Sequence, residues 1–270
     1  MSLTGAAQGV SAKEKLIVAL DVATAGEARR LFDALRDSAG MFKVGSQLFT
    51  SAGPEFVREI VGAGARVFLD LKFHDIPNTV AAASREAVRL GVALFNAHAA
   101  GGGEMMRRAS EATSEEAARL GVKRPALIAV TVLTSMDAEA LAETGVAADS
   151  VEAQVRRLAR LSDACRLDGV VASPHEIAPV REAVARAGFL VVTPGVRPAA
   201  AAHDDQKRVT SPAEAVRAGA DFVVVGRAIL NSPDPARAAS EVVREMEEVS
   251  QSSQKSVASR NPFYNALAKD

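Results

Sequence analysis

Short apolar segments alternate with amphipathic segments along almost the whole chain. The apolar segments cover residues 16–20, 41–44, 66–71, 94–97, 126–130, 169–171, 189–192 and 221–225. Their nearly unbroken apolar character is typical of parallel strands that are covered on both faces. The pattern therefore predicts eight buried strands.

The segments between these strands have helical periodicity. They cover residues 25–37, 55–62, 79–90, 103–120, 151–166, 174–187 and 212–218, and a last helix is expected over 234–248. Several of them end at a glycine before the next strand, as left-handed C-caps do. Eight strand–helix units in about 235 residues match an α/β fold of one domain, the (β/α)8 TIM barrel.

A doubly wound open sheet is the structural alternative. It is disfavoured because no glycine-rich dinucleotide loop follows the first strand, where Asp21 and Val22 lead straight into a helix. We expect an N-terminal extension over 1–14, a catalytic barrel over 15–249 and a C-terminal tail over 250–270. The tail is rich in Ser, Gln, Asn and Lys, which predicts flexibility.

Composition narrows the classes of partner. The 270 residues carry a net charge of -1, which argues against duplex DNA or an anionic membrane. Tryptophan is absent and there is one tyrosine, so stacking on single-stranded nucleic acid is not expected. The single cysteine, Cys165, excludes an internal disulfide and fits a reducing compartment. No signal-peptide pattern or membrane-length apolar run is present. We expect a cytoplasmic protein.

A cluster of charges follows the third apolar segment. Asp70 and Lys72 come at the end of the predicted strand, and Asp75 lies just beyond it, before Pro77. Because side chains alternate along a strand, Asp70 and Lys72 are expected on the same face. Charges at the end of a buried strand are costly unless they pair or take part in chemistry. The cluster indicates either a functional site or a structural ion pair.

Other polar residues also fall at predicted strand ends, where barrel active sites form. Each has a simpler interpretation: Asp21 as a helix cap, Lys43 as a surface lysine, His98 as a core histidine and Thr134 as a helix cap. No histidines have metal-ligand spacing, so a metal site is not expected. The polar residues at these ends are Asp21, Lys43, Asn96, His98, Thr131, Thr134, Ser135, Arg197, Gly226 and Arg227.

The loops after strands seven and eight indicate a phosphate site. In barrels of this kind, backbone N–H groups of these loops converge on an anion. Gly226 permits close approach of the backbone, and Arg227 offers a two-pronged guanidinium. Arg197 adds a second guanidinium, and Gln206 offers an amide. The expected ligand is a phosphorylated small molecule.

Six motifs together resemble the orotidine 5'-phosphate decarboxylase family in its bacterial form, over about residues 15–248. The most specific is Asp-Leu-Lys-Phe-His-Asp-Ile-Pro-Asn-Thr at 70–79. The others are VALD at 18–21, FKVG at 42–45, VTVLTS at 130–135, TPGVRP at 193–198 and VGR at 225–227. The resemblance implies a TIM barrel that converts orotidine 5'-phosphate to UMP and carbon dioxide, the last step of de novo pyrimidine biosynthesis. It implies no metal and no organic cofactor.

The resemblance also assigns roles by matching position. Thr134 falls at the base-contacting position, and Asp75 and Thr79 enter the neighbouring subunit's site, which implies a homodimer. Asp21 and Lys43 serve the ribose and the charge network, Asp70, Lys72 and Asp75 form the charged array, and Arg197, Gln206, Gly226 and Arg227 hold the phosphate.

The chemistry of the residues agrees with this resemblance. An ammonium at Lys72 would stabilise negative charge at C6 of the pyrimidine and then donate the proton. Asp70 and Asp75 would keep Lys72 protonated. Two alternatives stay open: a Mg²⁺-dependent sugar-phosphate decarboxylase or aldolase of the same barrel superfamily, and a non-catalytic nucleotide-binding barrel. The 73–79 segment and Gly226-Arg227 disfavour the first, and retention of the whole charged array disfavours the second.

Overall fold

The computed structural model of the chain describes residues 11–147, 149–198 and 210–260, with side chains as far as residue 248. Eight parallel strands close into one barrel, in which β1 pairs with both β2 and β8. The strands are β1 (Leu16–Ala19), β2 (Met41–Gly45), β3 (Val67–Phe73), β4 (Leu94–His98), β5 (Ala126–Val130), β6 (Gly169–Val171), β7 (Leu190–Thr193) and β8 (Phe222–Val225). The predicted (β/α)8 barrel is confirmed.

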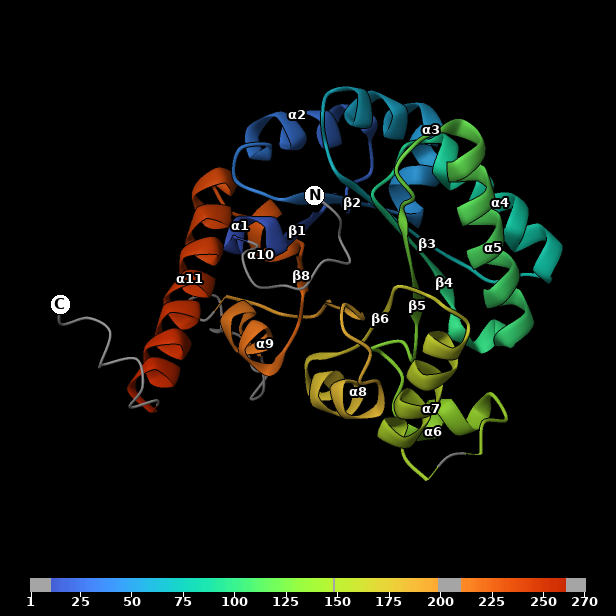
Figure 1. Cartoon of the computed structure of the whole chain (residues 1–270). Coiled ribbons are helices and arrows are strands. Elements are labelled where there is room, and N and C mark those ends of the chain that lie inside the picture. Colours follow the sequence, from blue (N-terminus) through green and yellow to red (C-terminus); the bar gives the residue numbers. More distant parts are fainter. Residues whose placement is uncertain (1–10, 148, 199–209, 261–270) are drawn as a thin grey trace, which may run out of the picture.

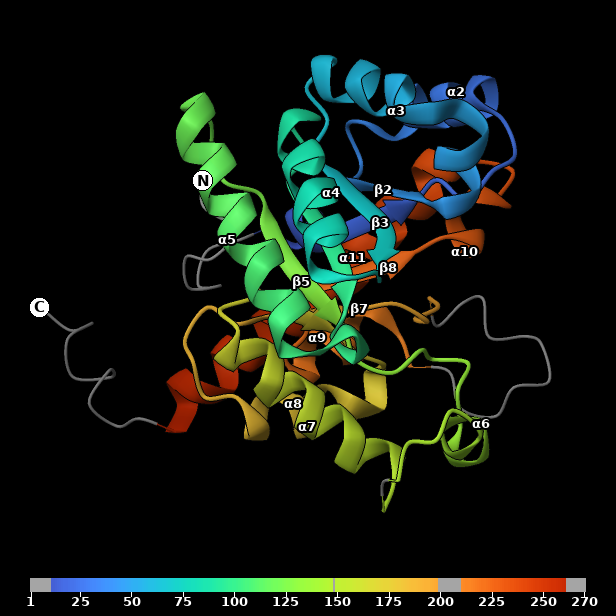
Figure 2. The same cartoon turned by 90° about the vertical axis from the view of Figure 1, so that its right-hand side faces the viewer.

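Helices surround the strands in both views (Figures 1 and 2). Among the described residues, none of them has the length and apolar character that crossing a membrane requires. They are α1 (Ala12–Lys15), α2 (Ala25–Leu35), α3 (Ser46–Gly62), α4 (Pro77–Arg89), η1 (Ala99–Gly101), α5 (Gly102–Leu120), α6 (Ala138–Glu143), α7 (Val151–Ala164), η2 (Pro174–Glu176), α8 (Ile177–Ala183), α9 (Pro212–Ala218), α10 (Arg227–Leu230) and α11 (Pro235–Arg260).

The predicted element boundaries were wrong in three places. The helix expected over 55–62 is the second part of α3, and a first helical stretch from Ser46 was missed. The two parts meet at a kink at Gly53, which has a non-helical φ of 70° before Pro54. The helix predicted over 174–187 is the short η2 followed by α8, which ends at Ala183. The last helix runs to Arg260 rather than 248, so part of the segment assigned to a flexible tail is helical.

Alternation along the strands divides the core into two layers. In β1, Leu16 and Val18 face the helices, whereas Ile17 and Ala19 belong to a separate cluster inside the barrel. Phe68 of β3 lies in the same inner cluster and is almost fully buried. The interior of the barrel is therefore filled with side chains.

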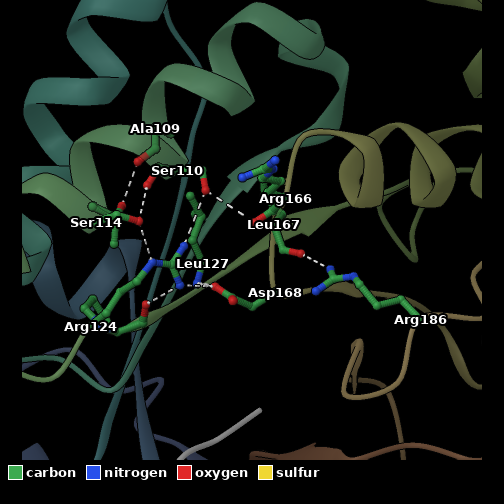
Figure 3. A network of polar contacts seen from close by, with 11 residues as sticks. Ala109, Ser110, Ser114, Arg124, Leu127, Arg166, Leu167, Asp168 and Arg186 are labelled. Atoms are coloured by element: carbon green, nitrogen blue, oxygen red, sulfur yellow. Dashed lines mark hydrogen bonds and ion pairs between the residues drawn. The ribbon is translucent and has the colours of Figure 1, made fainter.

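Hydrogen bonds to two aspartates connect neighbouring strands at the amino-terminal end of the barrel. Asp168, directly before β6, accepts hydrogen bonds from the backbone N–H of Leu127 over 2.7 Å and from Arg124 Nη1 over 2.6 Å (Figure 3). Asp221, directly before β8, accepts the backbone N–H of Val191 in the same way, over 2.7 Å. These contacts stabilise the end of the barrel that is opposite the candidate site.

Candidate active site

A cavity of about 660 Å³ opens at the carboxyl ends of the strands. Its floor is apolar and includes Ala19, Phe68 and Val192 of the inner cluster. Its walls carry most of the polar residues that the sequence singled out. The predicted site residues that line it are Asp21, Lys43, Asp70, Lys72, Thr134, Arg197, Gly226 and Arg227.

Four of these side chains form a row of alternating charge on one side of the cavity. Lys43 Nζ lies 2.8 Å from Asp21 Oδ1 and 3.3 Å from Asp70 Oδ2. Lys72 Nζ lies 2.6 Å from Asp70 Oδ1. The simpler interpretations of Asp21 as a helix cap and Lys43 as a surface lysine are therefore wrong. Thr24, not Asp21, caps α2, and Lys43 is buried.

Asp70 and Lys72 lie side by side as expected, but regular alternation is not the whole reason. The pairing of β3 with β4 shifts register between Leu69 and Phe73. Within that interval Lys72 has a φ of 53°, in the left-handed region that side chains other than glycine rarely adopt. Such conformations gather at functional sites, where the surrounding structure holds them in place.

Asn96, on the neighbouring strand β4, contacts both of these residues. Its Nδ2 donates to Asp70 Oδ1 over 2.8 Å, and its Oδ1 accepts the backbone N–H of Lys72 over 2.8 Å. Asn96 was expected at a strand end but was not among the predicted site residues. The signal that could have found it is a polar residue at an inward position of a buried strand.

Opposing effects act on the ionisation of the buried groups. Burial alone would raise the pKa of Asp70, but the charges of Lys43 and Lys72 and the hydrogen bonds from Lys72 and Asn96 bring it below its ordinary value. Burial lowers the pKa of His98, helped by the nearby His74 and Lys72. Asp70 is therefore a carboxylate at neutral pH, and His98 is half-buried and neutral.

A side chain at position 45 would crowd the lysine of this row. A Cβ on Gly45 would lie 2.9 Å from Lys43 Nζ and 3.2 Å from Asp21 Oδ1. Any side chain there would push against the ion pair of Lys43 and Asp21. Gly226, in contrast, has ordinary room for a Cβ, since its nearest neighbour would be Ala19 Cβ at 3.5 Å. The expected approach of an anion to Gly226 would therefore involve its backbone, because this residue lines the cavity.

Two arginines also line the cavity. Arg197 follows β7, and its backbone N–H donates to the carbonyl oxygen of Thr210 over 3.2 Å. Arg227 follows Gly226 and opens the short helix α10. Thr134 is exposed on the loop after β5, before α6. His175, which the sequence analysis did not assign to the site, also lines the cavity, on the segment after β6.

Three predicted site residues are not brought into this cavity by the described chain. Asp75 and Thr79 are exposed and are not among the residues that line it. Asp75 Oδ1 instead accepts the backbone N–H of Ile76 over 2.6 Å. Gln206 lies outside the described residues. In the described ranges, no group of three or more His, Cys, Asp or Glu side chains is arranged to hold a metal ion.

A closed parallel barrel with a charged cavity at the carboxyl ends of its strands defines a (β/α)8-barrel protein with an enzyme-like site for an anionic ligand. The family follows from comparison with known proteins. The family model described as "Orotidine 5'-phosphate decarboxylase / HUMPS family" matches residues 14–242, and the chain belongs to this family.

Individual relatives agree over most of the chain. A protein of Moorella thermoacetica named orotidine 5'-phosphate decarboxylase is 54% identical over 239 residues, which are 88% of this chain and 94% of the relative. The protein of that name from Geobacter sulfurreducens is 55% identical over 235 residues, 87% and 97% of the two chains. A crystal structure of orotidine 5'-phosphate decarboxylase from Lactobacillus acidophilus has a TM-score of 0.76 and 33% identity, covering 86% of this chain and 98% of that one. The family resemblance seen in the motifs is confirmed.

Proposed function

We propose that the protein converts orotidine 5'-phosphate to UMP and carbon dioxide. The observation that carries the proposal is the alternating row from Asp21 to Lys72, which lines one cavity together with two arginines. Relatives with 54% and 55% identity are named for this reaction. Neither of these two relatives is named for the alternative reaction on a sugar phosphate.

Different residues of the cavity bind the phosphate, the ribose and the pyrimidine of the substrate. The phosphate binds to Arg197, Arg227 and the backbone at Gly226, with Gln206 as a further donor, because guanidinium groups match phosphate oxygens. Asp21 and Lys43 bind the ribose hydroxyls, and Thr134 contacts the pyrimidine. Binding energy from the phosphate, far from the reacting carbon, then helps to hold the base against the charged row.

The reaction breaks the bond between C6 and the carboxylate and leaves the electron pair on C6. In this scheme the Lys72 ammonium stabilises this negative charge, and its proton then transfers from Nζ to C6 to give UMP. Asp70 next to the substrate carboxylate adds repulsion, about 4 kcal/mol for two charges at 4 Å and an effective dielectric of 20. Stabilisation of the transition state contributes more, because the ammonium is already oriented by Asp70.

No metal or organic cofactor takes part in this scheme, because Lys72 supplies both the cationic charge and the proton. Cys165 is free and buried, as in proteins of a reducing compartment. We infer a cytoplasmic enzyme of pyrimidine biosynthesis.

The working unit is a homodimer in which Asp75 and Thr79 complete the site of the neighbouring subunit. In support, both side chains are exposed at the start of α4, beside Ile76, whose exposed fraction of 66% is large for an apolar residue. The cavity within one chain contains the carboxylates of Asp21 and Asp70 but lacks that of Asp75.

The test is a spectrophotometric assay of purified protein with orotidine 5'-phosphate, with and without EDTA. We expect loss of substrate absorbance, formation of UMP and carbon dioxide, and the same rate in both samples. A protein that is inactive on orotidine 5'-phosphate, but acts on a sugar phosphate when Mg²⁺ is added, would support the alternative instead. Loss of turnover on chelation would contradict the cofactor-free mechanism.

A further inference from the structure

Asn96 of β4 makes side-chain hydrogen bonds to two residues of the charged row. It is almost completely buried, with an exposed fraction of 1%. Its amide makes two hydrogen bonds of 2.8 Å, donating to Asp70 Oδ1 and accepting from the Lys72 backbone N–H. The two partners fix the orientation of the amide, since a carboxylate only accepts and a backbone N–H only donates.

These two hydrogen bonds lie where the regular pairing of β3 with β4 is interrupted. Between Leu69 and Phe73 the regular register of β3 against β4 is lost. The backbone N–H of Lys72 lies inside that interval, and the side chain of Asn96 takes the place of a ladder carbonyl. A buried N–H without a partner is costly, so this bond also supports the unusual φ of 53° at Lys72.

Asp70 Oδ1 is shared by Asn96 and Lys72. It accepts from Asn96 Nδ2 over 2.8 Å and from Lys72 Nζ over 2.6 Å. The Asn96 amide thus holds the backbone of the lysine and the carboxylate that orients its ammonium. No other described side chain is hydrogen-bonded to both residues in this way.

We propose that Asn96 is a positioning residue, which sets the Lys72 ammonium and the Asp70 carboxylate in register for proton transfer to the substrate. This inference rests on the proposed decarboxylation and adds to it a residue that does not touch the substrate. Because a displacement of about 1 Å at a reacting group can cost about 100-fold in rate, loss of this amide should act on turnover rather than on binding.

The Asn96→Asp variant keeps the size of the side chain and changes its hydrogen bonds. It therefore tests the two hydrogen bonds separately from packing. A protonated carboxyl has one O–H donor and one carbonyl acceptor, so it can make both hydrogen bonds of the amide. An ionised carboxyl cannot donate and repels Asp70. At low pH the inserted carboxyl and Asp70 share one proton. The charge of the neighbouring Asp70 raises the pKa of the inserted carboxyl. Activity relative to wild type should therefore fall as pH rises.

Other titratable groups face this position from the surrounding elements, and the pH profiles must be compared with allowance for them. They are Asp21 after β1, Lys43 on β2, Lys72 and His74 on and after β3, and His98 on β4. All of them are present in the wild type as well. The ratio of variant to wild-type activity at each pH cancels their own titration to first order.

The experiment measures kcat on orotidine 5'-phosphate, UMP affinity and the melting temperature for wild type, Asn96→Ala and Asn96→Asp. We expect Asn96→Ala to lower kcat by about 10- to 100-fold, with UMP affinity changed by less than about 3-fold. For Asn96→Asp, the activity ratio should fall by about 10-fold or more between about pH 5 and about pH 8. Thr113→Ala is the matched control: it removes a hydrogen bond of 2.7 Å from a fully buried side chain on α5.

Two results would overturn the inference. One is an Asn96→Asp profile parallel to that of wild type at all pH values. The other is a loss of activity in Asn96→Ala no larger than in Thr113→Ala at equal loss of thermal stability. If Asn96→Ala does not fold, the pH ratio of the nearly isosteric Asn96→Asp decides alone. A wild-type protein that is inactive on orotidine 5'-phosphate refutes the proposed function itself, and so the two failures are distinguishable.

Discussion

The ammonium of Lys72 and the carboxylate of Asp70 meet over 2.6 Å although the strand that carries both is irregular between them. A regular strand would place the two side chains on one face but about 7 Å apart along the chain. The left-handed backbone at Lys72 lies within this irregular stretch. The ion pair is thus built by a local departure from the strand, which the barrel as a whole stabilises.

Removal of this ammonium should abolish turnover and leave ligand binding largely intact. For Lys72→Ala we expect kcat to fall by at least about 10⁴-fold, because both the proton donor and the stabilising charge are lost. UMP should still bind, since Arg197 and Arg227 line the same cavity and are unchanged. Stopped assays and UMP titration by calorimetry measure the two effects. The exposed Lys123→Ala is the control, and wild-type kcat in Lys72→Ala would refute the assigned role.

Much of the fold was predictable because parallel barrel strands are buried on both faces and appear as continuous apolar runs. The eight strands lie where these runs predict them, within one or two residues at either end. Helix α3 was partly missed because Gly53 and Pro54 resemble a helix end in sequence. Only the backbone shows that the chain kinks at Gly53 and then continues as helix.

The site was predictable to the extent that the barrel brings strand ends together. Asp21 and Lys72 are far apart in sequence, yet topology alone places both at the rim of one cavity. The role of Asn96 was not predictable, because it depends on an unpaired N–H in an irregular strand. Asp75 and Thr79 stay outside the cavity of one chain, and a monomer sequence carries no geometric signal for a contact between subunits.

Arg227 should act through the phosphate. A hydrogen bond to a charged group contributes about 1.5–3 kcal/mol, so Arg227→Ala should weaken UMP binding by roughly 10- to 150-fold. Binding of uridine, which has no phosphate, should change little. The ratio of the two dissociation constants therefore isolates the effect. Arg244→Ala, on the exposed side of α11, is the control, and equal weakening of UMP and uridine would contradict the phosphate role.

Gly45→Ala should damage the site without unfolding the protein. Gly45 has φ -94° and ψ 179°, which alanine adopts readily, so the backbone tolerates the change. The added methyl would lie 2.9 Å from Lys43 Nζ and would displace it from Asp21. We expect activity to fall by about 10-fold or more, with little change in melting temperature. Gly26→Ala, where the new Cβ meets nothing within 4 Å, should keep wild-type activity.

Shared active sites can be tested with mixed dimers. Consider a heterodimer of a Lys72→Ala chain and an Asp75→Asn chain. The site of the Lys72→Ala chain would contain both substitutions, because Asp75 comes from the partner. The site of the other chain would be intact. We therefore expect the tandem-purified heterodimer to recover about half of the wild-type activity, because one of its two sites is whole. The control heterodimer pairs Lys72→Ala with Lys43→Ala. Both of those lysines contact Asp70 of their own chain, so neither site should work. Absence of recovery in the first heterodimer would contradict the crossing of Asp75.

Glu116 should make the stability of the barrel sensitive to acid. It lies on α5 with an exposed fraction of 3%, and accepts hydrogen bonds from Arg119 Nη2 and from Arg89 Nε of α4, both over 2.7 Å. The bonds from Arg119, followed by those from Arg89, lower the pKa of Glu116 from 4.5 to about 2.

A carboxyl with a lowered pKa in the folded state stabilises the fold above its ordinary pKa, and this stabilisation is lost as pH falls towards the folded value. Glu116→Gln should therefore be less stable than wild type at neutral pH. The two should converge as pH decreases from about 4.5 towards about 2. Urea midpoints measured from pH 7 downward test this, with the exposed Glu139→Gln as control. A difference between Glu116→Gln and wild type that stays constant over the whole range would show that packing, rather than ionisation, is responsible.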